Sequence, residues 1–304
     1  MKVFVAGATG AIGRPLIAAL IRQGHTVTGM THSETGAHAL HELGVAVAQV
    51  SAFDAAAVAA AVRASRAEVI IDELPALPKS PADMPAAREG DRRLRMEGGE
   101  HLRHAALTCG VRRYIQQSSG FFVAPGEGLA DEAVGMAVDA SPGVASHALT
   151  YAALEERLLA PGPLEGVSLR YGFFYGPNTW YHPDGACGEM VRRQEIPIIG
   201  KGNAVWSWVH IEDAASATVT ALTAPPGIYN VVDDDPSAVN VWLPAFARLA
   251  GAPTPPYITE DQARIACGED AVYYGTRLRG ASNAKAKKFL GFAPRRLEWL
   301  QARS

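Results

Sequence analysis

The amino-acid sequence predicts an α/β fold with a doubly wound parallel sheet and a smaller C-terminal lobe. Three observations lead to this prediction: a glycine-rich turn near the N-terminus, alternating strand and helix patterns to about residue 172, and a gathering of aromatic residues after it. Strands that alternate with helices form parallel sheets covered on both faces. We assign residues 1–172 to the sheet domain, which also receives about 205–232, and residues 173–304 to a substrate-binding lobe.

The glycine-rich turn is the strongest local signal. Residues 3–6 read as a buried strand, residues 12–21 as a helix, and between them stands GATGAIG, residues 7–13. In a Rossmann-type fold such glycines allow a tight turn, close approach of the backbone to a diphosphate, and close packing of helix on strand. The helix N-terminus adds free N–H groups. We therefore predict that a dinucleotide is bound by Gly7, Thr9, Gly10, Ala11, Ile12 and Gly13.

The second predicted strand, residues 25–30, bears on the choice of cofactor. It is followed by Thr31, His32 and Ser33, with no acidic side chain to bind a ribose 2'-hydroxyl. These three residues can instead donate hydrogen bonds to a 2'-phosphate. The sequence thus favours NADP, with NAD as the alternative.

The remaining sheet elements follow in order. We predict strands at 45–50, 68–74, 112–119 and 166–171, a helix at 55–64 with Asp54 as its N-cap, and a long helix at about 92–109. Ligands of doubly wound sheets bind beyond the carboxyl ends of the strands. Further cofactor contacts are therefore expected from Ala52, Phe53, Leu74, Ser118, Gly172 and Phe173.

The GxxGxxG spacing of the turn resembles the fingerprint of the extended and atypical short-chain dehydrogenases/reductases, known as NAD-dependent epimerases/dehydratases. Three later segments continue the resemblance over essentially the whole chain: SWVHIEDAASAT, GIYNVVDDDPS and SNAKAKKFLGFAPR. The resemblance implies a nicotinamide cofactor and a C-terminal lobe that supplies the substrate pocket. It also implies catalysis by a serine or threonine, a tyrosine, and a lysine four residues after the tyrosine. Ser119 matches the serine.

The tyrosine and lysine do not match. If Tyr151 is the family tyrosine, Glu155 stands at the lysine position, and a carboxylate raises the pKa of a phenol where the reaction needs it lowered from about 10. In a second alignment, Glu155 matches a family glutamate that follows the lysine by four residues. Tyr151 then takes the lysine position and His147 the tyrosine position. Either way the pair is absent, and the catalytic candidates are Ser119, Tyr151 and His147.

Composition limits the other classes of function. With 48% hydrophobic residues, 19% charged residues and a net charge of -3, the chain resembles a soluble globular protein without affinity for polyanions. Cys109, Cys187 and Cys267 show no paired spacing, so we expect buried thiols and no metal site. No signal peptide or membrane span is recognisable, and a cytoplasmic location is expected. The expected partner is a small-molecule substrate, not nucleic acid or a membrane, and a homodimer remains open.

We expect an NADP-dependent oxidoreductase that acts on a small, partly apolar carbonyl or alcohol, with Ser119 and Tyr151 orienting the substrate oxygen. Two alternatives remain. One is a cofactor-bound regulatory or scaffold protein that has lost the catalytic pair. The other is a non-redox lyase, isomerase or cyclase that uses His147 or Glu73 as its base.

Overall fold

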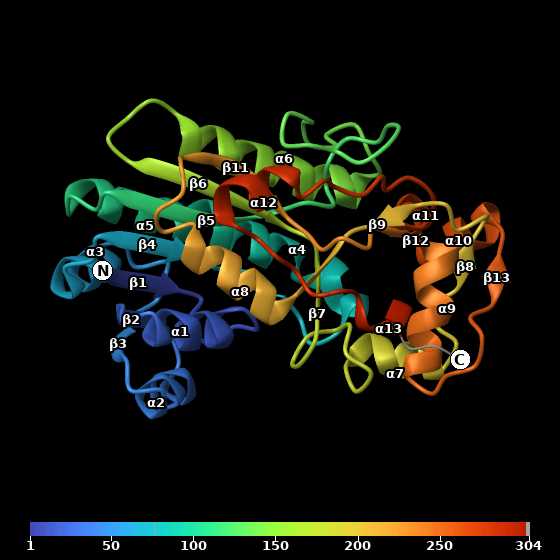
Figure 1. Cartoon of the computed structure of the whole chain (residues 1–304), viewed down its shortest axis with the longest axis horizontal. Coiled ribbons are helices and arrows are strands. Elements are labelled where there is room, and N and C mark those ends of the chain that lie inside the picture. The colour runs from blue at the N-terminus through green and yellow to red at the C-terminus, as the bar shows by residue number, and fades with distance from the viewer. Residues whose placement is uncertain (76, 302–304) are drawn as a thin grey trace.

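The computed structural model describes residues 1–75 and 77–301 and contains the predicted parallel sheet (Figure 1). Its seven described strands lie in the order β11-β6-β5-β4-β1-β2-β3, and all of their pairings are parallel. The bounds are β1 Lys2–Ala6, β2 Thr26–Thr31, β3 Ala46–Gln49, β4 Val69–Asp72, β5 Arg113–Ser119, β6 Glu165–Tyr171 and β11 Gly227–Val231. The strand order reverses between β1 and β4, and ligands of such sheets bind at this point.

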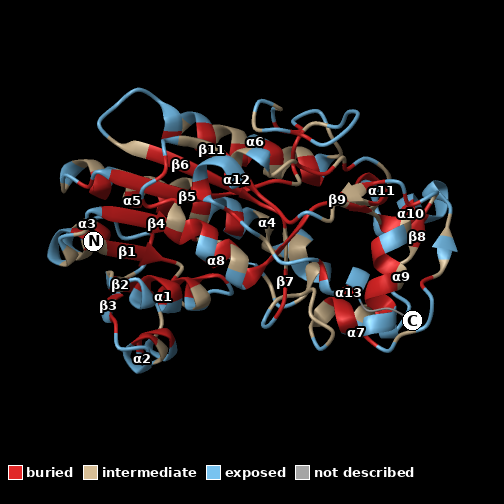
Figure 2. Ribbon diagram, viewed as in Figure 1, coloured by how far each residue is buried: buried red, intermediate tan, exposed pale blue. Residues whose placement is uncertain are grey.

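Helices cover both faces of the sheet, which confirms the doubly wound prediction. One face carries α1 (Gly13–Arg22), α2 (Glu34–Glu42), α8 (Ile211–Thr220) and α12 (Ala284–Leu290). The other carries α3 (Ala55–Ser65), α5 (Gly99–Thr108) and α6 (Pro142–Leu159). The strands between these layers are largely buried (Figure 2), as continuous apolar runs in a parallel sheet require.

The long helix predicted at about 92–109 begins earlier and is interrupted. The short 3-10 turn η1 (Pro81–Asp83) leads into α4 (Met84–Arg93), a π-helical turn η2 (Leu94–Gly98) follows, and α5 completes the helix. Gly98 and Gly99 let this helix pack closely on the sheet edge: a Cβ at Gly98 would lie 3.0 Å from the Cβ of Ala52 in the loop after β3, and one at Gly99 would lie 3.2 Å from Oδ2 of Asp72 on β4. Sequence periodicity does not reveal a π-helical turn, since one extra residue only shifts the apolar pattern.

The C-terminal lobe lies beside the carboxyl ends of the strands (Figure 1). Its helices are α7 (Ala186–Arg192), α9 (Val239–Leu249), α10 (Glu260–Cys267), α11 (Glu269–Thr276) and α13 (Glu298–Gln301). Its short strands are β7 (Phe173–Tyr175), β8 (Ile198–Ile199), β9 (Val205–Trp206), β10 (Trp208–His210), β12 (Ser237–Ala238) and β13 (Tyr257–Ile258). The chain returns from the lobe to the sheet through α8 and β11. Ala286, Leu290 and Phe292, which the sequence analysis groups with the lobe, join the core beneath α1 and α8.

The three cysteines differ in burial. Cys187 is buried, but Cys109 is only half-buried and Cys267 is exposed, so the prediction of three buried thiols is wrong for these two. Within the described part of the chain, no helix is long and apolar enough to cross a membrane.

Candidate functional site

The turn between β1 and α1 has the geometry that a diphosphate requires. Gly7 has a φ of +75°, and the N–H of Gly10 donates to its carbonyl oxygen at 2.9 Å. A Cβ at Gly7 would collide with the carbonyl oxygen of Glu73, and a Cβ at Gly13 would collide with that of Gly7. Ile12 precedes α1 without a side-chain cap, the N–H of Arg14 donates to the carbonyl oxygen of Gly10 at 3.4 Å, and Pro15 has no N–H. A ligand would therefore meet the N–H groups of the turn that come before Arg14. The residues that this turn leaves exposed or half-buried are Gly7, Thr9, Gly10 and Ala11.

The three polar residues after β2 differ in their surroundings. Thr31 is buried, and its hydroxyl accepts a hydrogen bond from the N–H of Ser33 at 3.4 Å. Ser33 is the N-cap of α2, where its Oγ accepts from the N–H of Gly36 at 3.1 Å and keeps its own proton for a ligand. His32 is exposed. A contact with a 2'-phosphate therefore depends on His32 and Ser33 more than on Thr31.

Two predicted contacts follow β3. The carbonyl oxygen of Ala52 lies 2.9 Å from Nδ1 of His101 on α5, and the residue is buried. Phe53 is 39% exposed, with the guanidinium of Arg93 4.3 Å from the centre of its ring. An exposed aromatic ring at a strand end offers a stacking surface for a planar base.

The carboxylate of Glu155, on α6, is buried and accepts four hydrogen bonds. Its Oε1 accepts hydrogen bonds from Oγ of Ser118 at 2.7 Å and Oγ of Ser168 at 3.0 Å. Arg170 binds both carboxylate oxygens, at 2.8 Å through Nε and 2.7 Å through Nη2. The carboxylate is therefore satisfied and ties α6 to β5 and β6, and the Ser118 hydroxyl is occupied in this network.

The three catalytic candidates lie around one short segment. Ser119 ends β5, is buried, and its Oγ accepts from the N–H of Phe121 at 3.4 Å. Phe122 packs against His147 and Tyr151, with ring centres 5.1 and 5.8 Å apart. Burial raises the pKa of Tyr151 to about 12 and lowers the pKa of His147. Neither group is thus tuned toward neutral pH by burial alone.

A buried arginine that is not among the predicted site residues lies beside Tyr151. Arg95 lies on the π-helical turn η2, its Nε donates to Asp91 at 2.9 Å, and its guanidinium carbon lies 5.0 Å from the centre of the Tyr151 ring. With Leu74, the predicted contact after β4, it lines a small cavity. The only sequence signal was the basic character of the segment RRLR, which is typical of a solvated helix face.

Glu73, at the carboxyl end of β4, is buried and incompletely bonded. Its Oε1 accepts from the Tyr171 hydroxyl at 3.0 Å, whereas Oε2 has no partner among the described residues. Burial raises the pKa of this carboxyl to about 8, so it is mostly protonated at neutral pH. The backbone carbonyl and Cβ of Glu73 pack against Gly7, so protonation of its carboxyl removes a negative charge from the residue that supports the glycine turn.

Aromatic rings fill the space after β6. A Cβ at Gly172 would lie 2.6 Å from the carbonyl oxygen of Ser207, so only glycine lets the two segments meet there. The half-buried ring of Phe173 lies between Phe121 and Trp206, with both ring-centre distances 4.0 Å and interplanar angles of 17° and 19°. We call these three residues the aromatic stack. The stack lies where the sheet meets the lobe, with Trp206 buried and the rings of Phe121 and Phe173 half-buried.

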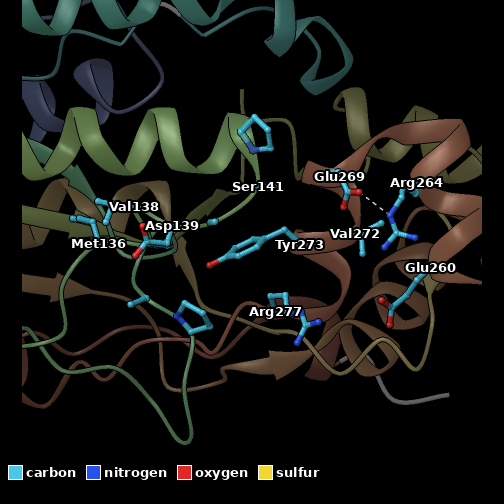
Figure 3. Close-up of a pocket in the computed structure, with 15 residues that line it drawn as sticks. Met136, Val138, Asp139, Ser141, Glu260, Arg264, Glu269, Val272, Tyr273 and Arg277 are labelled. Carbon is cyan, nitrogen blue, oxygen red and sulfur yellow. Dashed lines mark hydrogen bonds and ion pairs between the residues drawn. The ribbon is translucent and has the colours of Figure 1, made fainter.

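A separate pocket of about 700 Å³ lies between residues 124–142 and the α10–α11 pair (Figure 3). Tyr273 reaches across it toward the side where Met136 and Asp139 lie, and its buried hydroxyl has no partner among the described residues. Arg264 and Glu269 form an ion pair of 2.7 Å at its rim. None of the described residues that line it is a predicted site residue, so this pocket is distinct from the glycine turn.

Comparisons with known proteins agree with this geometry. The profile of the NAD dependent epimerase/dehydratase family matches residues 3–232. A protein from a Streptomyces species, named 3-diazoavenalumate denitrifying reductase, is 39% identical over 302 residues, which cover 98% of each chain. The UDP-glucose 4-epimerase of Thermus thermophilus, solved with NAD, is 25% identical with a TM-score of 0.72 and coverage of 97% and 94%. That of Thermotoga maritima, solved with UDP-glucose, is 20% identical with a TM-score of 0.77 and coverage of 98% and 95%.

Proposed function

Because the chain belongs to the NAD-dependent epimerase/dehydratase family, we propose that it is a nicotinamide-dependent reductase of a small, planar, partly apolar substrate. The observation that carries the proposal is the placement of the two halves of the site. The glycine turn lies at the switch point of the sheet, and the aromatic stack lies where the sheet meets the lobe. A bound nicotinamide supplies the hydride, and the residues of this chain bind, orient and shield the reactants.

The substrate class follows from the surface that receives it. Phe121 and Phe173 are the half-buried members of the aromatic stack, and aromatic rings contribute favourable face or edge contacts with planar molecules. Sugar epimerisation, the activity in the names of two structural neighbours, is less favoured because positions 151 and 155 hold tyrosine and glutamate in place of a Tyr-Lys pair.

The first acceptor that we propose is a carbonyl. Hydride addition to a carbonyl carbon leaves an alkoxide, which must take up a proton. The Tyr151 hydroxyl or the His147 ring supplies it, and Ser119 orients the oxygen. The raised pKa of Tyr151 makes it an acid that gives up its proton only to a strong base such as an alkoxide.

The second acceptor is a diazo-substituted arene, favoured by the name of the Streptomyces relative and by the missing Tyr-Lys pair. Hydride transfer to the ring carbon of an arenediazonium ion forms a C–H bond, breaks the C–N bond and releases N₂. The hydride brings both electrons, so the charges balance without a proton donor. An active site that has lost the Tyr-Lys pair is compatible with this reaction.

We further propose a preference for NADPH over NADH. The two positions directly after β2 hold the exposed His32 and the Ser33 hydroxyl in place of a carboxylate that could bind a free 2'-hydroxyl, and the first carboxylate, Glu34, stands in the first turn of α2. The preference rests on hydrogen bonds that His32 and Ser33 can donate to the phosphate.

Oxidation of NADPH and NADH, followed by absorbance, tests these proposals. One series receives aldehydes and ketones and the other arenediazonium salts with the same rings, and released N₂ is measured. Tyr151→Phe should slow carbonyl reduction by about 100-fold and leave dediazoniation nearly unchanged, and Ser119→Ala serves as the second variant. Cofactor binding without oxidation by any acceptor would contradict a reductase and favour a regulatory role.

A further inference from the structure

Arg95 lies buried at the point where the α4–α5 helix changes its winding. The π-helical turn η2 spans Leu94–Gly98, and such turns are rare and frequent at functional sites. The Arg95 side chain is 6% exposed, although arginine is almost never buried without a partner. Its partner is Asp91 one turn earlier, also buried, at 2.9 Å. The chain thus keeps an ion pair in its interior, next to a proposed catalytic residue.

The charge of this arginine is only partly used by the protein. Nε is bonded to Asp91, whereas the two Nη atoms make no hydrogen bond to any residue that the structure describes. The guanidinium carbon lies 5.0 Å from the centre of the Tyr151 ring. The contact joins two separate helices, and Arg157 of α6 reinforces it by donating to the carbonyl oxygen of Met96 in the same turn at 3.2 Å.

The following inference rests on the proposed function. We propose that Arg95 supplies the positive charge that a lysine at position 155 would have brought, and that it stabilises the anionic form of Tyr151. Glu155 does not reverse this effect, because its carboxylate is neutralised by Arg170. Arg95 is a positioning residue: it acts through Tyr151, whose hydroxyl becomes a stronger hydrogen-bond donor to the cofactor ribose or the substrate oxygen.

The charges around Tyr151 oppose one another, so the direction of each matters. Arg95 lowers the pKa of the phenol, and Asp91 and Glu73 raise it. Since Glu73 is largely protonated at neutral pH, Asp91 is the main opposing charge. Other titratable groups close to Tyr151 are His147 on its own helix and Tyr274 on α11. This balance predicts opposite outcomes for removing Arg95 and removing Asp91.

The test measures Tyr151 directly, without turnover. We would place 3-fluorotyrosine at position 151, which is more acidic than tyrosine, and follow its ¹⁹F resonance against pH in the full chain. Arg95→Met should raise the titration midpoint by about one pH unit, Arg95→Lys should restore most of it, and Asp91→Asn should lower it. Arg92→Met removes an exposed arginine that pairs with Glu89, and it should leave the midpoint unchanged.

Several outcomes would overturn the inference. One is a folded Arg95→Met variant in which the titration midpoint of residue 151 does not change. Another is an Arg92→Met variant whose midpoint shifts as much as that of Arg95→Met. If Arg95→Met does not fold, the pair Arg95→Met with Asp91→Asn removes both buried charges, and Asp91→Asn alone still has to lower the midpoint. Because the titration needs neither cofactor nor substrate, its failure is distinguishable from failure of the reductase proposal.

Discussion

The glycine turn after β1 and the inner face of α6 contribute to the proposed reaction in different ways. The turn acts through backbone geometry: the φ of Gly7 and the collisions that any Cβ would meet are set within a few residues and one neighbouring strand. The face of α6 acts through side chains whose charges depend on other elements, because Arg95 comes from η2 and Arg170 from β6. A site formed by the backbone of one segment tolerates no substitution of its glycines. A site assembled from side chains of several elements can lose a residue typical of the family when a side chain from another element takes over its role.

The largest expected effect tests whether Glu155 belongs to the structural part of α6. Arg170→Met leaves the Glu155 carboxylate buried without its counter-ion, and we expect a loss of about 3–5 kcal/mol in the free energy of unfolding. Denaturant titration measures it. The matched control is Arg170→Met with Glu155→Leu, which removes both charges and should lose much less. A loss below about 1 kcal/mol in the single variant would show that Glu155 is free to act on Tyr151.

The next-largest effect tests whether the shape of the glycine turn depends on its backbone geometry. Gly7→Ala adds left-handed strain and a collision with Glu73, and it should destabilise the chain by about 2–4 kcal/mol and abolish cofactor binding. Gly24→Ala is the control, because Gly24 has a φ of +76° with nothing within 4 Å of the added Cβ. It should cost about 1 kcal/mol and leave cofactor binding intact. Thermal unfolding and calorimetry with NADPH separate the two.

This contrast explains what the sequence could and could not predict. The strands and the glycine turn were predictable because their signals are local: apolar runs, helical spacing, and glycines at fixed offsets. The Asp54 cap of α3 was found for the same reason, and its carboxylate accepts from the N–H of Ala57. The neighbourhood of Tyr151 was not predictable, since the π-helical turn that brings Arg95 to it leaves no periodic signal. The pairing of Glu155 with Arg170 was not predicted either, because the two residues come from different elements, α6 and β6, and no local pattern links them.

A smaller effect links the turn to pH through Glu73, whose folded pKa of about 8 lies above its ordinary value of 4.5. Between these values the folded state holds a proton that the unfolded state has lost, so stability falls as the pH rises from about 5 to 8. Glu73→Gln mimics the protonated carboxyl and lacks this slope. Its advantage in unfolding free energy over the wild type should grow by roughly 1–2 kcal/mol between pH 6 and pH 8.

Asp233, with a pKa also raised to about 8, contributes the same slope to both proteins and cancels in this comparison. An advantage of Glu73→Gln that does not change with pH would mean that the carboxyl is already ionised beside Gly7. The turn would then carry a negative charge beneath the diphosphate, and its role in cofactor binding would need another explanation.

The smallest effect concerns Ser33, which caps the backbone of α2 and is also proposed to contact the 2'-phosphate of NADPH. Ser33→Asp keeps a good N-cap for α2 but brings a carboxylate to the proposed 2'-phosphate position. We expect the ratio of NADPH to NADH affinity to fall by about tenfold, about 1.4 kcal/mol, with stability unchanged. Ser33→Asn, which caps equally well without charge, should change the ratio far less. An unchanged ratio in Ser33→Asp, measured by calorimetry with both cofactors, would place the 2'-position away from Ser33. The preference for NADPH would then rest on the His32 side chain alone. The adenine half of the cofactor would in that case be recognised by side chains, as on α6, and not by the backbone, as at the glycine turn.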